Sequence, residues 1–170
     1  MAIEVKNILI FRGSKDKIHA LMGSVKSTAE NGEERPFDFG KVLPIPENVY
    51  KGNLGIEEEK LYPGELNWYG WCSKYWHTKW NAFETEVFEG SEGEGYSFLT
   101  AWNPPHPVIE KLAENNPSIM IIHLWASEDL TGGYRYYVTG KRHITAELTK
   151  GRFEDQAFAQ GIWRGDFYKI

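Results

Sequence analysis

The stretch FETEVFEGSEGEGYSFLTAWN, residues 83–103, carries two strand-like runs that are separated by a glycine-rich connection. β-branched and aromatic residues favour strands, and glycines in a short connection favour a tight reversal of the chain. We therefore predict a β-hairpin with strands near residues 83–89 and 96–103. Its position decides the fold, because a strand and a helix precede it and a helix and a strand follow it.

The first of these flanking pairs lies at the start of the chain. Residues 4–12, EVKNILIFR, read as a strand, and Ser14 can cap a helix whose apolar residues recur at helical spacing. After the hairpin, prolines at 104–107 precede a helix that Pro117 ends, and residues 118–126 read as a further strand. The resulting order of elements is that of an α+β, ferredoxin-like split βαβ fold, in which two helices cover one face of an antiparallel sheet.

Two segments add to this plan. Residues 132–148 read as an extra C-terminal strand, and the tail after it as a short helix and a packing strand. Residues 28–82 form an irregular insertion between the first helix and the second strand, because prolines interrupt regular structure there. We expect one domain over residues 1–170.

The insertion contains NWYGWCSKYWHTKW, residues 67–80, with four tryptophans in fourteen positions. Glu65 to about Trp76 can form a short helix. The predicted strands are apolar on both faces, so both faces of the sheet need cover. The two helices cover one face, and we expect the tryptophan-rich insertion to cover the other. Packing is the preferred interpretation of this segment, and a binding pocket is the alternative.

Composition places the chain among globular proteins of ordinary size. The 170 residues are 41% hydrophobic and carry a formal net charge of −5, which disfavours non-specific binding to nucleic acid phosphates or anionic lipid. Cys72 is the only cysteine, so no internal disulfide is possible. No secretion signal or membrane-spanning apolar run is visible. The expected location is the cytoplasm of a bacterial host cell, with no membrane partner.

Motifs for catalysis or metal binding are missing. Cys72 and His77 supply only two ligands, where zinc needs three or four. The chain has no P-loop, no GxSxG motif and no dinucleotide-binding glycine pattern before a helix. We predict no catalytic residues, no metal site and no cofactor, and lean away from an enzyme. GYSFL at 95–99 is similar to the core of an RNA-recognition motif, but Glu94 and Ala101 stand where that motif has a basic and an aromatic residue, so nucleic acid is a less favoured partner.

Two sets of residues are candidates for binding. A pocket between the insertion and the sheet can be lined by tryptophans with nearby polar groups: Trp80, Trp102 and Trp125 with Asn81, His77 and His123. A run of glutamates can present carboxylates to a basic partner: Glu84, Glu86, Glu89, Glu92 and Glu94.

Four segments also occur in a characteristic order: VLPIPENV, NWYGWCSKYWHTKWNA, FLTAWNPPHPVIEKLAENNP and HLWASEDLTGGY. Together they resemble the YubB-type ferredoxin-like domain of phage and plasmid proteins, a family of unassigned function. The resemblance implies the fold and an origin in a mobile element, and it supplies no catalytic residues. The prediction is an accessory protein that binds a host or phage protein and modulates a host system. The alternatives are a small-ligand binder or enzyme with a tryptophan-lined pocket, and an RNA-recognition-like binder.

Overall fold

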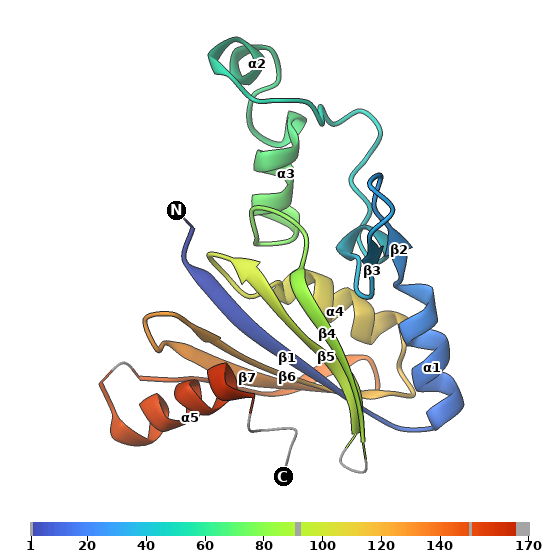
Figure 1. The fold of residues 1–170 in the computed structure, drawn as a ribbon, viewed down its shortest axis with the longest axis vertical. Coiled ribbons are helices and arrows are strands. Elements are labelled where there is room, and N and C mark those ends of the chain that lie inside the picture. The colour runs from blue at the N-terminus through green and yellow to red at the C-terminus, as the bar shows by residue number, and fades with distance from the viewer. Residues whose placement is uncertain (1, 91–92, 150, 166–170) are drawn as a thin grey trace.

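A computed structural model of the chain describes residues 2–90, 93–149 and 151–165. Within these residues the largest sheet has six antiparallel strands in the order β4-β5-β1-β6-β7-β8 (Figure 1). The strands are β1 (Glu4–Arg12), β4 (Phe83–Gly90), β5 (Gly93–Ala101), β6 (Met120–Ser127), β7 (Gly132–Val138) and β8 (Lys141–Glu147). The helices are α1 (Lys15–Ser24), α2 (Ile56–Leu61), α3 (Trp68–Tyr75), α4 (His106–Asn115) and α5 (Phe153–Arg164). A short β2–β3 pair (Ser27–Thr28 and Glu34–Arg35) and two 3-10 turns (Phe39–Lys41 and Gly64–Leu66) complete the insertion.

The first four long strands confirm the predicted ferredoxin-like plan. β1 lies between β5 and β6, and β4 flanks β5, so the elements β1-α1-β4-β5-α4-β6 form the split βαβ unit. The sheet then continues beyond this unit. The predicted extra strand at 132–148 is divided into β7 and β8, because Thr139 and Gly140 both have positive φ and make a two-residue hairpin turn.

Two sets of side chains cover one face of the sheet. We call it the helix face, and it is formed by Leu9, Phe11, Tyr96, Phe98 and Ile121. Apolar side chains of α1 and α4 pack on it, and so do aromatic side chains of the insertion. The Phe37 ring stacks on Tyr96 with centroids 5.1 Å apart, and Phe39 meets Phe98 edge-on at 6.0 Å. The insertion therefore completes the core that α1 and α4, each of ten residues, leave open over β4 and β5.

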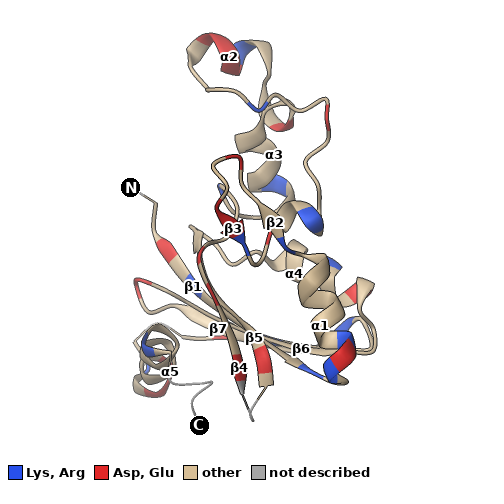
Figure 2. Ribbon diagram, turned by 45° about the vertical axis from the view of Figure 1, so that its right-hand side comes forward, with Lys and Arg blue, Asp and Glu red and all other residues tan. Residues whose placement is uncertain are grey.

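A different element covers the opposite face. Ile8, Ile10 and Leu124 pack against Ile162 and its neighbours in α5. Figure 2 shows α5 on one side of the sheet and α1 and α4 on the other. The expectation that the insertion covers this second face was wrong. The C-terminal helix takes that place. The packing strand predicted for the aromatic end IWRGDFYKI, residues 162–170, was wrong for residues 162–164, which belong to α5, and residues 166–170 lie outside the described residues.

The tryptophan-rich segment is divided between core and surface. Trp71, Cys72 and Trp76 are buried, and the Trp76 indole donates a hydrogen bond of 2.9 Å to the Leu43 carbonyl oxygen. Trp80 is 41% exposed. The interpretation as packing thus holds for Trp71, Cys72 and Trp76 and fails for Trp80.

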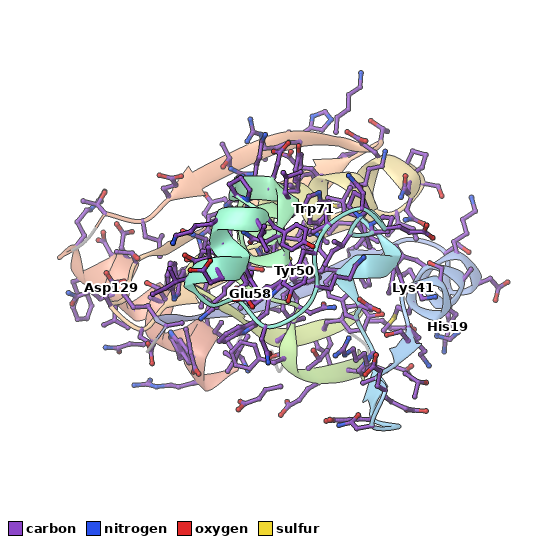
Figure 3. The ribbon with its side chains drawn as sticks, turned by 90° about the horizontal axis from the view of Figure 1, so that it is seen from above. His19, Lys41, Tyr50, Glu58, Trp71 and Asp129 are labelled. Carbon is purple, nitrogen blue, oxygen red and sulfur yellow. The ribbon has the colours of Figure 1, made fainter. Side chains whose placement is uncertain are left out.

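The α2 lobe, residues 51–66, stands away from the sheet at the top of the molecule (Figure 1). None of the α2 side chains is buried. Tyr50 and Tyr62 stack at its base with centroids 4.4 Å apart (Tyr50 and Glu58 are labelled in Figure 3). No helix among the described residues combines the length and the apolar character needed to cross a membrane.

Candidate functional site

Two cavities open at one end of the sheet, where β1 begins and β5 and β6 end. The tryptophan cleft has a volume of about 510 Å³ and is lined by Ala2, Glu4, Lys79, Trp80, Phe83, Ala101 and Trp102. The histidine pocket has a volume of about 600 Å³ and is lined by Ser73, His77, Asn103, Pro104, His106, Trp125, Thr131, Gly132, Glu147 and Leu148. The predicted single pocket between insertion and sheet is therefore two separate cavities. Trp80 and Trp102 belong to one, and His77 and Trp125 to the other.

The backbone at Trp102 sets the shape of the tryptophan cleft. β5 ends at Ala101, and Trp102 has φ of 76°, a region that bulky residues rarely occupy. Its backbone N–H donates a 2.7 Å hydrogen bond to the Ile3 carbonyl oxygen, which holds the turn. Regular alternation along β5 would put Trp102 on the same face as Tyr96 and Phe98, and the alternation is broken at this point. The indole is 50% exposed and lines the cleft, while the other two rings are buried.

Lys79 connects the aromatic groups around the cleft. Its Nζ lies 4.6 Å from the centroid of the Trp80 ring and 5.9 Å from that of Tyr69. Tyr69 in turn meets Trp102 edge-on, with centroids 6.5 Å apart. The ring faces attract the ammonium group, and the Lys79 side chain is half-buried. The cleft thus offers an apolar surface with one cation, Lys79, and one carboxylate, Glu4, in its lining.

Asn81, a predicted binding residue, has a structural role. Its Oδ1 accepts hydrogen bonds from the backbone N–H groups of Phe39 (3.0 Å) and Ala82 (2.9 Å), and its Nδ2 donates to Asp38 Oδ1 at 2.7 Å. Burial raises the pKa of Asp38, but hydrogen bonds from Ser27, Asn81 and the Gly40 N–H outweigh this and lower the pKa below its ordinary value. Asn81 therefore lines neither cavity and ties the segment before β4 to the insertion.

His123, also predicted to bind, lies fully buried on β6 beside the histidine pocket. Asn7 Nδ2 donates to the Val5 carbonyl oxygen and to Thr100 Oγ1, so Asn7 Oδ1 is the acceptor that faces His123 Nε2 at 3.0 Å. The His123 proton accordingly sits on Nε2, and Nδ1 carries a lone pair without a partner among the described residues.

His106 forms the link between this buried group and the cavity. Its ring meets Trp125 edge-on at 4.6 Å and His123 at 5.5 Å between centroids. Burial, together with the nearby charges of Arg135, His77 and Arg142, lowers the pKa of His106 to about 3. Burial, with His106 and Arg135, also lowers the pKa of His123 far below its ordinary value. Both imidazoles are neutral near pH 7.

The predicted glutamates do not share one surface. Glu86 pairs with Ser97 and Glu89 with Glu94, so Glu86 and Glu89, three residues apart on one strand, point to opposite faces. Glu84, with φ of 48°, lies at a bulge beside the insertion, and Glu92 lies outside the described residues. Figure 2 shows the acidic positions along β4 and β5.

One group of side chains in the described part of the chain could hold a metal ion. Ligand atoms of His19, Glu89 and Glu94 all lie within 4.8 Å of one another, and His19 Nε2 is 2.9 Å from Glu94 Oε2. His19 and Asp129 lie at opposite ends of the molecule (Figure 3), and Asp129 contacts Thr131 of the histidine pocket. The sequence analysis missed the group of His19, Glu89 and Glu94 because His19 belongs to α1, which is far along the chain from the hairpin that carries the two glutamates.

A family model described as "Ferredoxin-like domain in Api92-like protein" matches residues 75–163, more than half of the chain. The chain belongs to this Api92-like family. The match includes most residues that line the two cavities, and it confirms the ferredoxin-like part of the resemblance found in the sequence. A crystal structure of a protein api92 from Yersinia pseudotuberculosis is similar at 17% identity with a TM-score of 0.48, over 71% of this chain and 43% of that one. The chain thus spans less than half the length of that protein. The search among curated proteins finds no match.

Proposed function

We propose that this chain is a protein-interaction module whose tryptophan cleft receives an apolar side chain of a partner protein. The observation that carries the proposal is the pair Trp80 and Trp102, each about half exposed, on two separate segments that line one cavity. Tryptophan is the residue type most enriched at the energetic centres of protein interfaces. Covering the exposed half of one indole removes on the order of 100 Å² from water and contributes about 2.5 kcal/mol.

Two further features support a protein partner. The α2 lobe projects from the same end of the sheet and exposes apolar side chains, with Ile56 75% and Leu61 70% exposed (Figure 1). Lys79 and Glu4 in the cleft lining favour a partner that carries charged or polar groups beside its apolar anchor. The glutamates of β4 and β5 are dispersed and do not form a single docking surface for a basic partner.

The partner we propose is a host or phage protein in the cytoplasm of a bacterium, and the module's role is to modulate a host system. The sequence resemblance to phage and plasmid domains supports this setting. Stacking of nucleic acid bases is not part of the proposal, because Tyr96 and Phe98 are buried beneath Phe37 and Phe39.

The test uses the cleft to capture its partner. A photo-crosslinking phenylalanine analogue placed at position 80 is irradiated in bacterial lysate, and the crosslinked protein is identified and purified. We expect Trp102→Ala to weaken binding of that protein at least about tenfold, or ~1.4 kcal/mol. Phe153→Ala removes an aromatic side chain that is 85% exposed on α5, and as the control it should bind like the unmodified chain. Equal affinities for the Trp102→Ala variant and the unmodified chain would contradict the proposal.

A further inference from the structure

The histidine pocket gathers hydrogen-bonding side chains that have no hydrogen-bond or ion-pair partner among the described residues. They come from five places in the chain: Ser73 on α3, His77 after it, Asn103 before α4, His106 on α4 and Glu147 on β8. Protein folds pair most of the polar groups that they bury, and His106 Nδ1 is buried without a partner among the described residues, whereas the other four side chains are exposed. Convergence of this many unpaired groups on one cavity is the arrangement that small-molecule sites show.

The sheet places two of the lining residues in one row. Trp125, Gly133 and Glu147 are cross-strand neighbours on β6, β7 and β8. A Cβ atom at Gly133 would come within 2.6 Å of Trp125 Cζ2, so only glycine lets the indole lie against β7. The indole therefore covers Gly133, and Trp125 and Glu147 at the two ends of the row line the cavity.

Charges around the pocket select a neutral ligand. Among the described lining residues the fixed charge is the Glu147 carboxylate. Behind Trp125, the guanidinium groups of Arg135 and Arg142 lie 3.4 and 3.9 Å from the Glu110 carboxylate. These two cations and two carboxylates carry no net charge together, so the surroundings of the pocket favour neither an anionic nor a cationic ligand.

The hydrogen-bonding groups select the ligand further. The Glu147 carboxylate can only accept hydrogen bonds, whereas the Asn103 amide and the Ser73 hydroxyl both donate and accept them. A neutral imidazole donates a hydrogen bond from one ring nitrogen and accepts one at the other. A hydroxyl group both donates and accepts, so several hydroxyls on one ring can satisfy this mixed set. We propose that the histidine pocket binds a neutral polyhydroxylated molecule, either a free saccharide or the sugar ring of a nucleoside. The volume of about 600 Å³ accommodates either.

The proposal goes beyond protein binding at the tryptophan cleft and uses none of the side chains tested there. Its test is calorimetric titration of the full chain with uridine, adenosine, maltose and sucrose, and with two charged comparators, uridine monophosphate and glucosamine. We expect at least one neutral probe to bind, and to bind more tightly than a charged comparator. Binding of nucleosides alone assigns the sugar ring to a nucleoside, and binding of disaccharides alone assigns a free saccharide; both results support the proposal.

Variants of the pocket complete the test. Glu147→Gln and Asn103→Ala should each weaken binding about tenfold, because each removes a hydrogen-bonding partner of the ligand. Glu154→Gln on α5 and Asn53→Ala in the α2 lobe are exposed, matched controls and should bind like the unmodified chain. The proposal is overturned by absence of binding of every neutral probe at about 10 mM, by tighter binding of the charged comparators, or by unchanged affinity in both pocket variants.

Discussion

Buried histidines make the stability of the fold sensitive to acid. The pKa of His106 is lowered from 6.5 to about 3 in the folded chain. Between these values the unfolded chain binds the proton and the folded chain does not, so stability is lost as the pH falls below about 6.5. At pH 5 one such histidine costs about 2 kcal/mol. We expect urea denaturation to show a smaller loss of stability between pH 7 and pH 5 for His106→Gln than for the unmodified chain, by about that amount.

The control for this effect is His143→Gln, since His143 is exposed on β8. That variant should keep the pH profile of the unmodified chain. A His106→Gln profile parallel to the unmodified one would show that His106 takes up its proton equally in both states, contrary to its burial against Trp125.

Cys72 is a second residue whose burial decides its chemistry. The side chain is 2% exposed on α3, and burial raises the pKa of the thiol to about 12. The reactive thiolate is therefore scarce at pH 8. We expect iodoacetamide to leave the native chain unmodified over hours and to alkylate it fully in guanidinium chloride, as measured by mass spectrometry. Alkylation of the native chain at the rate of a free thiol would mean that α3 does not pack as described.

At the scale of elements, the tryptophans of the insertion differ in what they stabilise. Trp76 is buried against Phe39 and Trp71, whereas Trp80 lines an open cleft. Trp76→Ala should lower the free energy of unfolding by about 3–5 kcal/mol, because it leaves a cavity and an unpaired carbonyl at Leu43. Trp80→Ala should change it by less than about 1 kcal/mol. Urea denaturation of the two variants side by side measures the difference, and equal losses would contradict this division.

The order of the elements could be predicted from the sequence, but the element that covers each face of the sheet could not. Periodicity and proline positions gave the order of elements around β4 and β5, because strands and helices leave local patterns. They also indicated that both sheet faces are covered. Which element covers each face depends on the path of the chain after β8 and after α1, and local patterns do not record that path. The insertion and α5 both offer apolar side chains, so the choice between them required the structure.

The candidate site was predictable to a similar extent. The sequence predicts a pocket between insertion and sheet that Trp80, Trp102, Trp125 and His77 help to line, and each of them lines one of the two cavities. The positive φ of Trp102 turns its indole away from the strand pattern, and this separates the two cavities. Asn103 and His106 were missed because WNPPHP was interpreted as the start of a helix and as part of a family resemblance, and not as a source of binding residues. Connections at the ends of strands often carry binding residues, and that rule is the signal that would have selected them.

At the scale of the whole molecule, the sheet lies between two layers that are far apart in the sequence. α1, α4 and the insertion cover one face, and α5 covers the other, so the last described helix is part of the fold and not an appended tail. Ile162 of α5 is fully buried in one apolar cluster with Ile8, Ile10, Leu124 and Ala126. The Trp163 indole N–H donates a hydrogen bond of 3.1 Å to the Ser127 carbonyl oxygen. The cooperative unit should therefore include residues from both ends of the chain.

Two isoleucines provide a matched test of this architecture. Ile162→Ala should lower the free energy of unfolding by about 2–4 kcal/mol, because it creates a cavity between α5 and the sheet. Ile56→Ala, in the α2 lobe, should change it by no more than about 0.5 kcal/mol, since that side chain is 75% exposed. Both variants should unfold in urea in a single transition when followed by tryptophan fluorescence and by far-ultraviolet circular dichroism. If Ile162→Ala were as harmless as Ile56→Ala, or if α5 unfolded in a separate earlier transition, the second face of the sheet would not depend on this helix.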